Sequence, residues 1–186
     1  MANSTANVTA GKPKSTGGVY RAPLGTTLPT DATTALGSSF VGLGFVTDAG
    51  MTQSYNHQST EIKDWGGATI LTTEEGLTDT YQFTLAEALN IDALKAFFGN
   101  SNVTGTLATG ITVTGNANAV EAACYVFELA VAGGGYRRIV LPNAKPSTRA
   151  DVQYVGNNVV GYGITLACMP DSSGNTHYEY TVKSST

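Results

Sequence analysis

The sequence predicts an α+β domain that is mostly β, built from antiparallel strands with one packed helix. Its 186 residues include 27 Thr and 22 Gly. Thr favours strands, whereas Gly breaks helices and serves turns. Only 13% of residues are charged and 41% are hydrophobic, which argues against disorder over most of the chain. A chain of this length is sufficient for one well-packed domain.

The first segment, residues 1–35, is small and polar and is interrupted by Pro13, Pro23 and Pro29. This composition predicts an extended N-terminal arm without a core element, followed by a single β domain over residues 36–186. Such an arm is either disordered or ordered against a partner, and the sequence favours neither.

Residues 40–47, "FVGLGFVT", predict a strand, and Asp48-Ala49-Gly50 predicts a turn after it. We expect a long hairpin over residues 52–75 that reverses at Gly66-Gly67. In the returning strand, Thr80, Gln82 and Thr84 alternate with Tyr81, Phe83 and Leu85, which is the period of two of a half-buried strand.

One helix is predicted, over residues 90–99. Asn90 suits the N-cap, Asp92 places a negative charge in the first turn, and Gly99 suits the position after the last turn. Its apolar residues fall on one face, so we expect this short helix to be held by packing on the sheet.

The rest of the chain predicts strands and turns. A Gly-rich reversal at 132–135 precedes a strand in which Arg137 and Arg138 are expected to be exposed charges on an edge. Cys124 and Cys168 lie in apolar runs and are expected to be buried thiols. The strands are expected at 106–115, 119–131, 136–142, 158–169 and 176–182, with a loop at 143–151 and a turn at 171–175.

Charge is concentrated in one segment. Residues 1–50 carry three Lys or Arg against two Asp, residues 51–85 one Lys against five acids, and residues 86–186 six Lys or Arg against seven acids. These sum to +1, −4 and −1, which gives the formal net charge of −4. This balance argues against a protein that reads nucleic acids.

The sequence offers little for catalysis, and we expect no enzyme, no metal and no cofactor. His57 and His177 have no Cys, His or carboxylate at metal-ligand spacing, and no GxSxG, P-loop or HExxH motif occurs. "AGGGYRR" lacks a following helix, so a hairpin turn is favoured over a phosphate cradle. The acids of residues 61–75 lie in a solvated segment, and Trp65 is expected to anchor the turn by packing rather than to stack on a sugar.

Three stretches in series, "FVGLGFVTDAGMTQSYNHQSTEIKDWGG", "TDTYQFTLAEALNIDALKAFFG" and a run of strands, resemble the major tail (tail tube) proteins of long-tailed, non-contractile bacteriophages. The resemblance covers roughly residues 15–183. It implies an antiparallel β-sandwich or half-barrel of the tail-tube fold with a flanking helix. It also implies self-assembly into hexameric rings that stack into a tube, the conduit for DNA ejection.

The same resemblance implies partners and site residues. The partners are other copies of the chain, a tape measure protein, a tail terminator and tail-tip proteins, while DNA passes through the lumen without specific binding. The protein is expected in the virion, made in the host cytoplasm, and no leader or membrane span is expected. Strands within 40–85 are expected to line the lumen and to form ring contacts, with the acidic cluster as a charged wall: Glu61, Asp64, Trp65, Glu74, Glu75 and Asp79.

Two other functions are compatible with the sequence. One is a secreted or surface β-sandwich that binds carbohydrate or protein through Trp65 and its tyrosines. The other is the tube protein of a phage-derived injection device, which has the same fold and a different cargo.

Overall fold

The computed structural model describes residues 3–14 and 17–183. Within these ranges the protein has eleven strands, the α-helix α1 (Ile91–Phe98) and two short 3-10 turns, Thr5–Asn7 and Asn100–Asn102. The strands are β1 (Gly11–Pro13), β2 (Val19–Pro23), β3 (Val41–Gly42), β4 (Val46–Lys63), β5 (Thr69–Leu85), β6 (Val103–Thr106), β7 (Gly110–Val113), β8 (Ala123–Val131), β9 (Gly135–Arg149), β10 (Tyr162–Cys168) and β11 (Tyr178–Lys183).

Nine strands form one antiparallel sheet in the order β3-β2-β8-β9-β10-β5-β4, with β1 also paired to β8 and β11 to β9. β6 and β7 pair separately beside α1. The sheet ends in β3 and β4 and does not close into a barrel. The predicted fold class, mostly antiparallel β with one helix, is therefore confirmed for the described residues.

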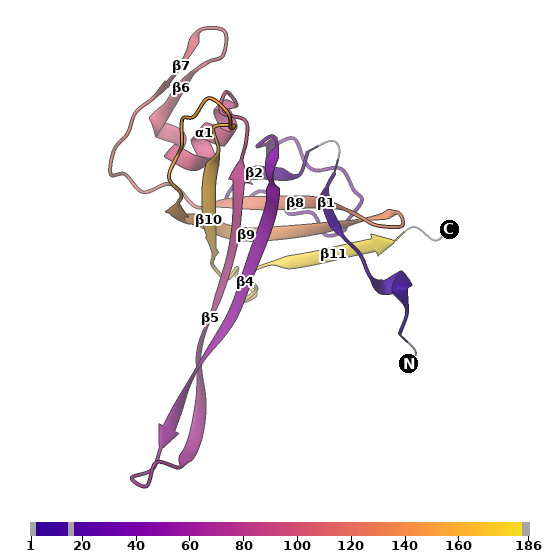
Figure 1. Ribbon diagram of the computed structural model, residues 1–186, viewed down its shortest axis with the longest axis vertical. Coiled ribbons are helices and arrows are strands. Elements are labelled where there is room, and N and C mark those ends of the chain that lie inside the picture. Colours follow the sequence, from indigo (N-terminus) through magenta and orange to yellow (C-terminus); the bar gives the residue numbers. More distant parts are fainter. Residues whose placement is uncertain (1–2, 15–16, 184–186) are drawn as a thin grey trace.

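Strand β9 joins two halves of the sheet that cross each other (Figure 1). Its first part, Gly135–Val140, pairs with β11, and its second part, Ala144–Arg149, pairs with β10. The register with β8 shifts between Ala123 and Tyr125, and such a bulge bends a strand. The main core lies where the two halves face each other.

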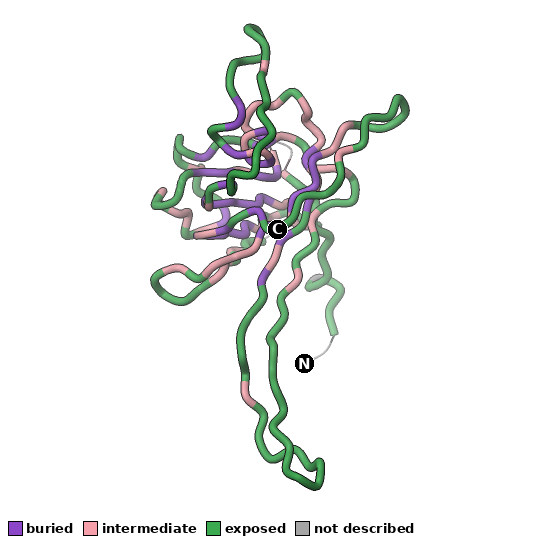
Figure 2. Tube along the Cα trace, turned by 90° about the vertical axis from the view of Figure 1, so that its left-hand side faces the viewer, coloured by how far each residue is buried: buried purple, intermediate pink, exposed green. Residues whose placement is uncertain are grey.

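The main core is formed by side chains that alternate along the strands. In β5, Tyr81, Phe83 and Leu85 are buried, whereas Gln82 between them is exposed. Phe127 packs against both Tyr81 and Phe83, with ring centroids 5.6 and 5.3 Å apart. Figure 2 shows the buried residues concentrated in the body, while the long hairpin below it is exposed along most of its length.

Helix α1 covers one end of this core. The Asn90 side chain accepts hydrogen bonds from the backbone N–H groups of Asp92 and Ala93, as the capping prediction requires. Gly99, with φ of 103°, ends the helix and donates its N–H to the carbonyl of Lys95. Leu94 and Phe97 are buried against the sheet.

Part of the segment predicted as an arm without a core element is a core strand, so that expectation is wrong for β2. Val19 and Ala22 are buried, and β2 pairs with both β3 and β8. Five residues between prolines and glycines are too few to show a period, and the pairing partners lie far along the chain.

Two predicted reversals are strand instead. The expected turn at residues 48–50 is a bulge within β4, where Val46 pairs with Leu85 and Met51 with Phe83. The expected loop at 143–151 is mostly the second part of β9, and it accommodates Pro146 beside a register shift. Proline is tolerated in sheets at such irregular positions.

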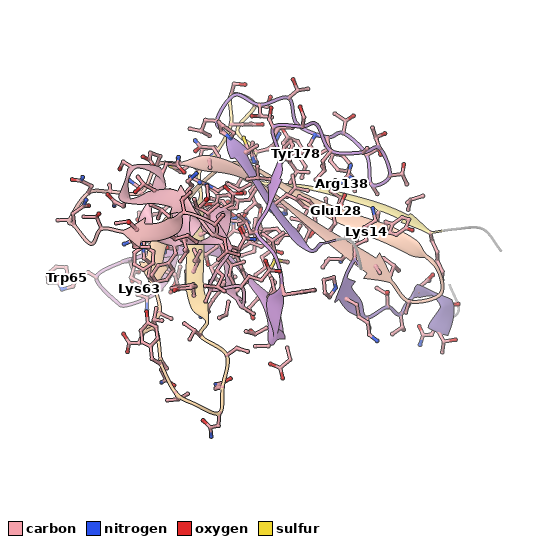
Figure 3. All side chains as sticks on the ribbon, turned by 90° about the horizontal axis from the view of Figure 1, so that it is seen from above. Lys14, Lys63, Trp65, Glu128, Arg138 and Tyr178 are labelled. Atoms are coloured by element: carbon pink, nitrogen blue, oxygen red, sulfur yellow. The ribbon has the colours of Figure 1, made fainter. Side chains whose placement is uncertain are left out.

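Arg138 is not an exposed edge charge, because β9 lies inside the sheet and Arg138 is 1% exposed. It donates to the Glu128 carboxylate through Nε at 3.0 Å and through Nη2. It also donates to the carbonyls of Asp31 and Thr34 at 2.8 Å each, which fastens the segment between β2 and β3 to the sheet. Lys14 Nζ lies 3.3 Å from the second oxygen of Glu128 (Figure 3).

Both cysteines are free thiols, but only Cys124 is fully buried, while Cys168 is partly buried. Burial raises the pKa of the Cys168 thiol to about 12 and also raises that of Cys124. Neither is an activated nucleophile, since reactivity requires the thiolate.

Candidate functional site: the projecting hairpin

The hairpin of β4 and β5 is the most prominent feature outside the body (Figure 1). The two strands pair from Val46 and Leu85 at the root to Lys63 and Thr69 near the tip. It therefore extends beyond the 52–75 expected from the sequence. The sequence favours this because neither strand contains proline and β5 is rich in Thr.

The tip is a short turn organised by Asp64. Its carboxylate accepts the N–H of Ala68 at 2.7 Å, its backbone N–H donates to the Ala68 carbonyl at 2.8 Å, and its carbonyl accepts the N–H of Gly67 at 3.0 Å. Gly67 has a φ of 87°, a conformation that glycine adopts without strain. The reversal is thus where Gly66-Gly67 predicts it, and Asp64 contributes to the turn itself.

Trp65 does not pack on the turn, so its expected role as an intramolecular anchor is wrong. Its side chain is fully exposed and points away from the body (Figure 3). Other apolar side chains along the hairpin are also exposed, namely Tyr55, Ile62, Ile70, Leu71 and Leu77. An isolated two-stranded hairpin is marginally stable in water, so covering these side chains with another surface would stabilise it.

The carboxylates predicted as one cluster are spread along the hairpin. Glu61 lies 3.7 Å from Lys63 on its own strand and accepts a hydrogen bond from Thr69 at 3.2 Å. Glu74 is exposed opposite Ser59, and Glu75 has no cross-strand partner because it occupies a bulge.

Asp79 differs from the other acids because it is 2% exposed and fixed at the root of the hairpin. Its Oδ2 accepts from Thr176 Oγ1 and lies 2.7 Å from His177 Nδ1, while Oδ1 accepts from Gln53 Nε2 at 3.2 Å. Tyr55 contacts the His177 ring edge-on at 5.6 Å. This cluster ties the hairpin to the segment before β11.

Sequence reasoning did not find the Asp79 cluster, because Asp79 and His177 are 98 residues apart and no local pattern connects them. Asp79 was grouped with the exposed acids by composition alone. Asp79 precedes Tyr81 and Phe83 by two and four residues, so strand alternation places all three on the same, core-facing side of β5. This alternation was the one available signal.

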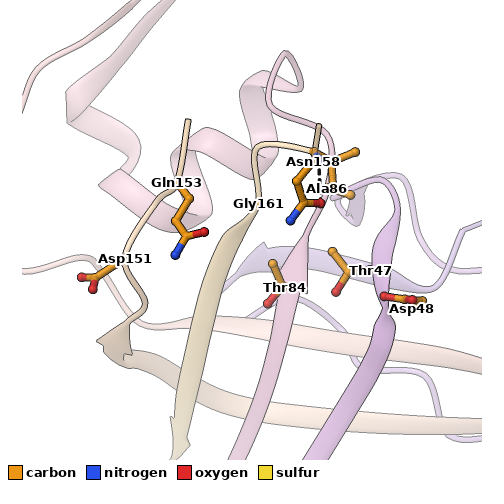
Figure 4. Close-up of a pocket in the computed structure, with 9 residues that line it drawn as sticks. Thr47, Asp48, Thr84, Ala86, Asp151, Gln153, Asn158 and Gly161 are labelled. Carbon is orange, nitrogen blue, oxygen red and sulfur yellow. Dashed lines mark hydrogen bonds between the residues drawn. The ribbon is translucent and has the colours of Figure 1, made fainter. Parts of the chain in front are cut away.

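A pocket of about 370 Å³ lies where the chain between β9 and β10 meets the upper ends of β4, β5 and β10 (Figure 4). Asp48 and Asp151 stand at opposite sides of it, with Thr47 and Thr84 on the strands between. Besides the two carboxylates, the lining contains the hydroxyl groups of these threonines and the side-chain amides of Gln153 and Asn158.

The described residues contain no group of three or more His, Cys, Asp or Glu side chains placed to hold a metal ion. Among the same residues, the one α-helix is too short to traverse a lipid bilayer.

Comparison with known proteins identifies a family. A family model described as phage tail tube protein matches residues 1–184. A search of curated protein sequences found no match. Among solved structures, one similar chain comes from the tube-terminating cap of the anti-feeding prophage. The two chains are 14% identical, the match covers 98% of this chain and 100% of that chain, and the TM-score is 0.49. Another similar chain comes from the PVC sheath-tube complex, in the extended state, of an extracellular contractile injection system. It is 12% identical, the match covers 97% of this chain and 100% of that chain, and the TM-score is 0.47.

Proposed function

The chain belongs to the phage tail tube protein family, and from this membership we propose that it self-assembles into hexameric rings that stack into a tube. Its role is structural, as a component of the phage tail. In this proposal the tube is the conduit for DNA ejection, and DNA passes through it without specific binding. Other copies of the chain are its main partners, and a tape measure protein, a tail terminator and tail-tip proteins meet the tube inside or at its ends.

The observation that carries the proposal is the projecting hairpin. The hairpin is exposed along most of its length (Figure 2). Its apolar side chains are uncovered, and the fully exposed Trp65 lies in the turn at its tip. Aromatic anchors of this kind carry much of the energy of protein interfaces. A second copy provides the cover that the isolated hairpin lacks, and a contact between different surfaces of identical subunits extends into rings or filaments.

We assign the hairpin residues predicted from the sequence to these contacts. Glu61, Asp64 and Trp65 lie at or near the tip, and Glu74 and Glu75 lie farther along β5. Asp79 supports the contact indirectly, because it fixes the root from which the hairpin projects. Single surface ion pairs contribute little, but symmetry repeats each one around a ring.

Negative-stain electron microscopy of the purified chain, with its mass measured by light scattering, tests this function. Hollow tubes or six-fold rings are expected. A chain that stays monomeric at high concentration, even with tail-tip proteins added to start growth, contradicts the proposal.

A pair of variants tests the hairpin. Trp65→Ala is expected to stop tube growth and to leave the unfolding of the monomer unchanged, because the side chain has no contact to lose within the subunit. Tyr154→Ala is the control, since Tyr154 is also a strongly exposed aromatic residue but lies between β9 and β10. Equal loss of assembly in both variants would show that the hairpin has no special part in it.

A further inference from the structure

One face of the hairpin carries only uncharged polar side chains along most of its length. Directly paired residues of an antiparallel ladder point to the same side. The register pairs Thr52 with Gln82, Ser54 with Thr80 and Asn56 with Thr78. These six residues, here called the neutral face, are exposed or half-buried.

The neutral face continues in both directions. Toward the tip, Gln58 and Thr60 follow on β4. Toward the body, Thr165 of β10 pairs with Gln82 and with Thr148 of β9, so hydroxyl groups extend across the sheet. Lys145 of β9 pairs with Ala167 of β10, which pairs with Thr80, so one lysine lies on this surface at its β9 end.

The opposite face of the same strands has a different chemistry. Near the body it carries Tyr81 and Asp79, which belong to the core and to the root cluster. Farther out it carries Glu74 opposite Ser59, and Glu61 opposite Thr72. The hairpin thus separates its neutral polar groups from the acids that dominate its net charge.

This separation bears on how DNA passes through a tube. Lysine or arginine on a channel wall would neutralise phosphates, and each contact would add salt-dependent affinity. Carboxylates repel phosphates, but at physiological salt this acts only over about 8 Å. Hydroxyl and amide groups bind water and one another, as Asn56 Nδ2 donates to Ser54 Oγ at 2.8 Å, and give a hydrated surface that neither holds nor repels DNA.

We propose that the neutral face, continued by β10 and the end of β9, lines the channel and that DNA is its occupant in passage. The carboxylates of the opposite face then belong to subunit contacts and not to the wall. This inference rests on the proposed function. The orientation follows from the body, since the opposite face of these strands is covered by the core, which leaves the neutral face as the free surface of the sheet.

Cysteine labelling of assembled tubes tests the orientation. Thr80→Cys and Gln82→Cys place thiols on the neutral face, and Leu107→Cys places one on the exposed β6–β7 tip beyond α1 as a control. The parent chain provides the blank, because burial raises the pKa of both native thiols. Each variant is treated with a small maleimide and with a maleimide carried on a protein too wide for the channel.

Before assembly, both reagents are expected to label every variant. In tubes, the neutral-face cysteines are expected to keep labelling by the small reagent and to lose labelling by the large one, while Leu107→Cys keeps both. Labelling of the neutral face by the large reagent would place it outside the tube, and labelling by neither would place it between copies; either result overturns the inference while the proposed function stands. Absence of tubes from the parent chain overturns both.

A charge-matched pair tests the chemistry of the wall. Thr52→Lys with Thr78→Lys adds two positive charges to the neutral face, and Leu107→Lys with Ala108→Lys adds the same charge at the exposed β6–β7 tip. The neutral-face pair is expected to make tubes retain short duplex DNA, with the log–log salt slope steeper by about 0.9 per phosphate contact. Equal retention by tubes of the β6–β7 variant would show that the neutral face is not the surface that meets DNA, and would overturn the inference.

Discussion

Arg137 and Arg138 are adjacent on β9 and allow a stringent test of what burial does to an ion pair. Arg138 is 1% exposed and Glu128 6% exposed, and the arginine also donates to two backbone carbonyls. Arg137 Nη2 lies 3.4 Å from Glu179 Oε2, but these side chains are 43% and 31% exposed. Arg138→Met therefore removes a buried ion pair, whereas Arg137→Met removes an exposed one.

Arg138→Met is expected to lower the free energy of unfolding by about 3–5 kcal/mol, because it leaves the Glu128 carboxylate buried with Lys14 as its remaining partner. Arg137→Met is expected to cost about 0–1 kcal/mol, since water replaces an exposed pair at little cost. At about 2–4 °C per kcal/mol for a chain of this size, the melting temperature of the first variant falls by about 6–20 °C.

Urea unfolding of the unassembled chain, followed by circular dichroism, measures both values. The double variant Arg138→Met with Glu128→Leu is expected to recover much of the loss, because apolar groups can replace a buried pair without leaving a charge behind. Equal costs for Arg137→Met and Arg138→Met, or a double variant less stable than Arg138→Met, would refute this reasoning.

Three further predictions concern the hairpin and the turn before β11. Asp79→Ala should lower the free energy of unfolding by about 1.5–3 kcal/mol, the range for a hydrogen bond to a charged group, and hydrogen exchange should quicken at the hairpin root; unchanged exchange there would contradict a tethering role. The hydroxyl of Tyr178 and nearby backbone N–H groups lower the pKa of Asp171 below its ordinary value of 3.8, so its contribution is present above that pH and is lost as the pH falls further. Acid titration of unfolding should therefore be shallower for Asp171→Asn, and an identical acid slope would refute the assignment. Glu74→Lys with Glu75→Lys should impair tube growth seen by electron microscopy without changing monomer stability; unimpaired growth would remove both acids from the contacts.

The structural features that could be predicted from the sequence are those that depend only on residues close together in the chain. The helix with its Asn90 cap and Gly99 end, the reversal at Gly66-Gly67 and the alternation of 80–85 were all predicted, because each depends on residues a few positions apart. The strand character of 143–149 was missed because proline and polar residues signal a loop locally. Pairing with β10 and a bulge beside Pro146 decide otherwise.

The burial of Arg138 and the root cluster of Asp79 depend on contacts between distant segments. Glu128 lies directly across from Arg138 in the register of β8 and β9, and the carbonyls that complete its hydrogen bonding come from residues 31–34. Local charge rules place arginine at a surface because they contain no information about such partners. The same limitation explains why Asp79 was grouped with the exposed acids of its segment.

The side to which Glu74 points shows why the distribution of charge could not be derived from alternation alone. Counting by twos from Thr80 and Thr78 places Glu74 on the neutral face. The bulge at Glu75 shifts the register, so that Gln58 pairs with Gly76 but Ser59 pairs with Glu74, which moves this acid to the opposite face. A one-residue shift reverses every side chain beyond it. The net charge of −4 over residues 51–85 is therefore correct as a sum, but it does not describe a uniform acidic surface: a single unpaired residue decides whether the wall proposed here is neutral.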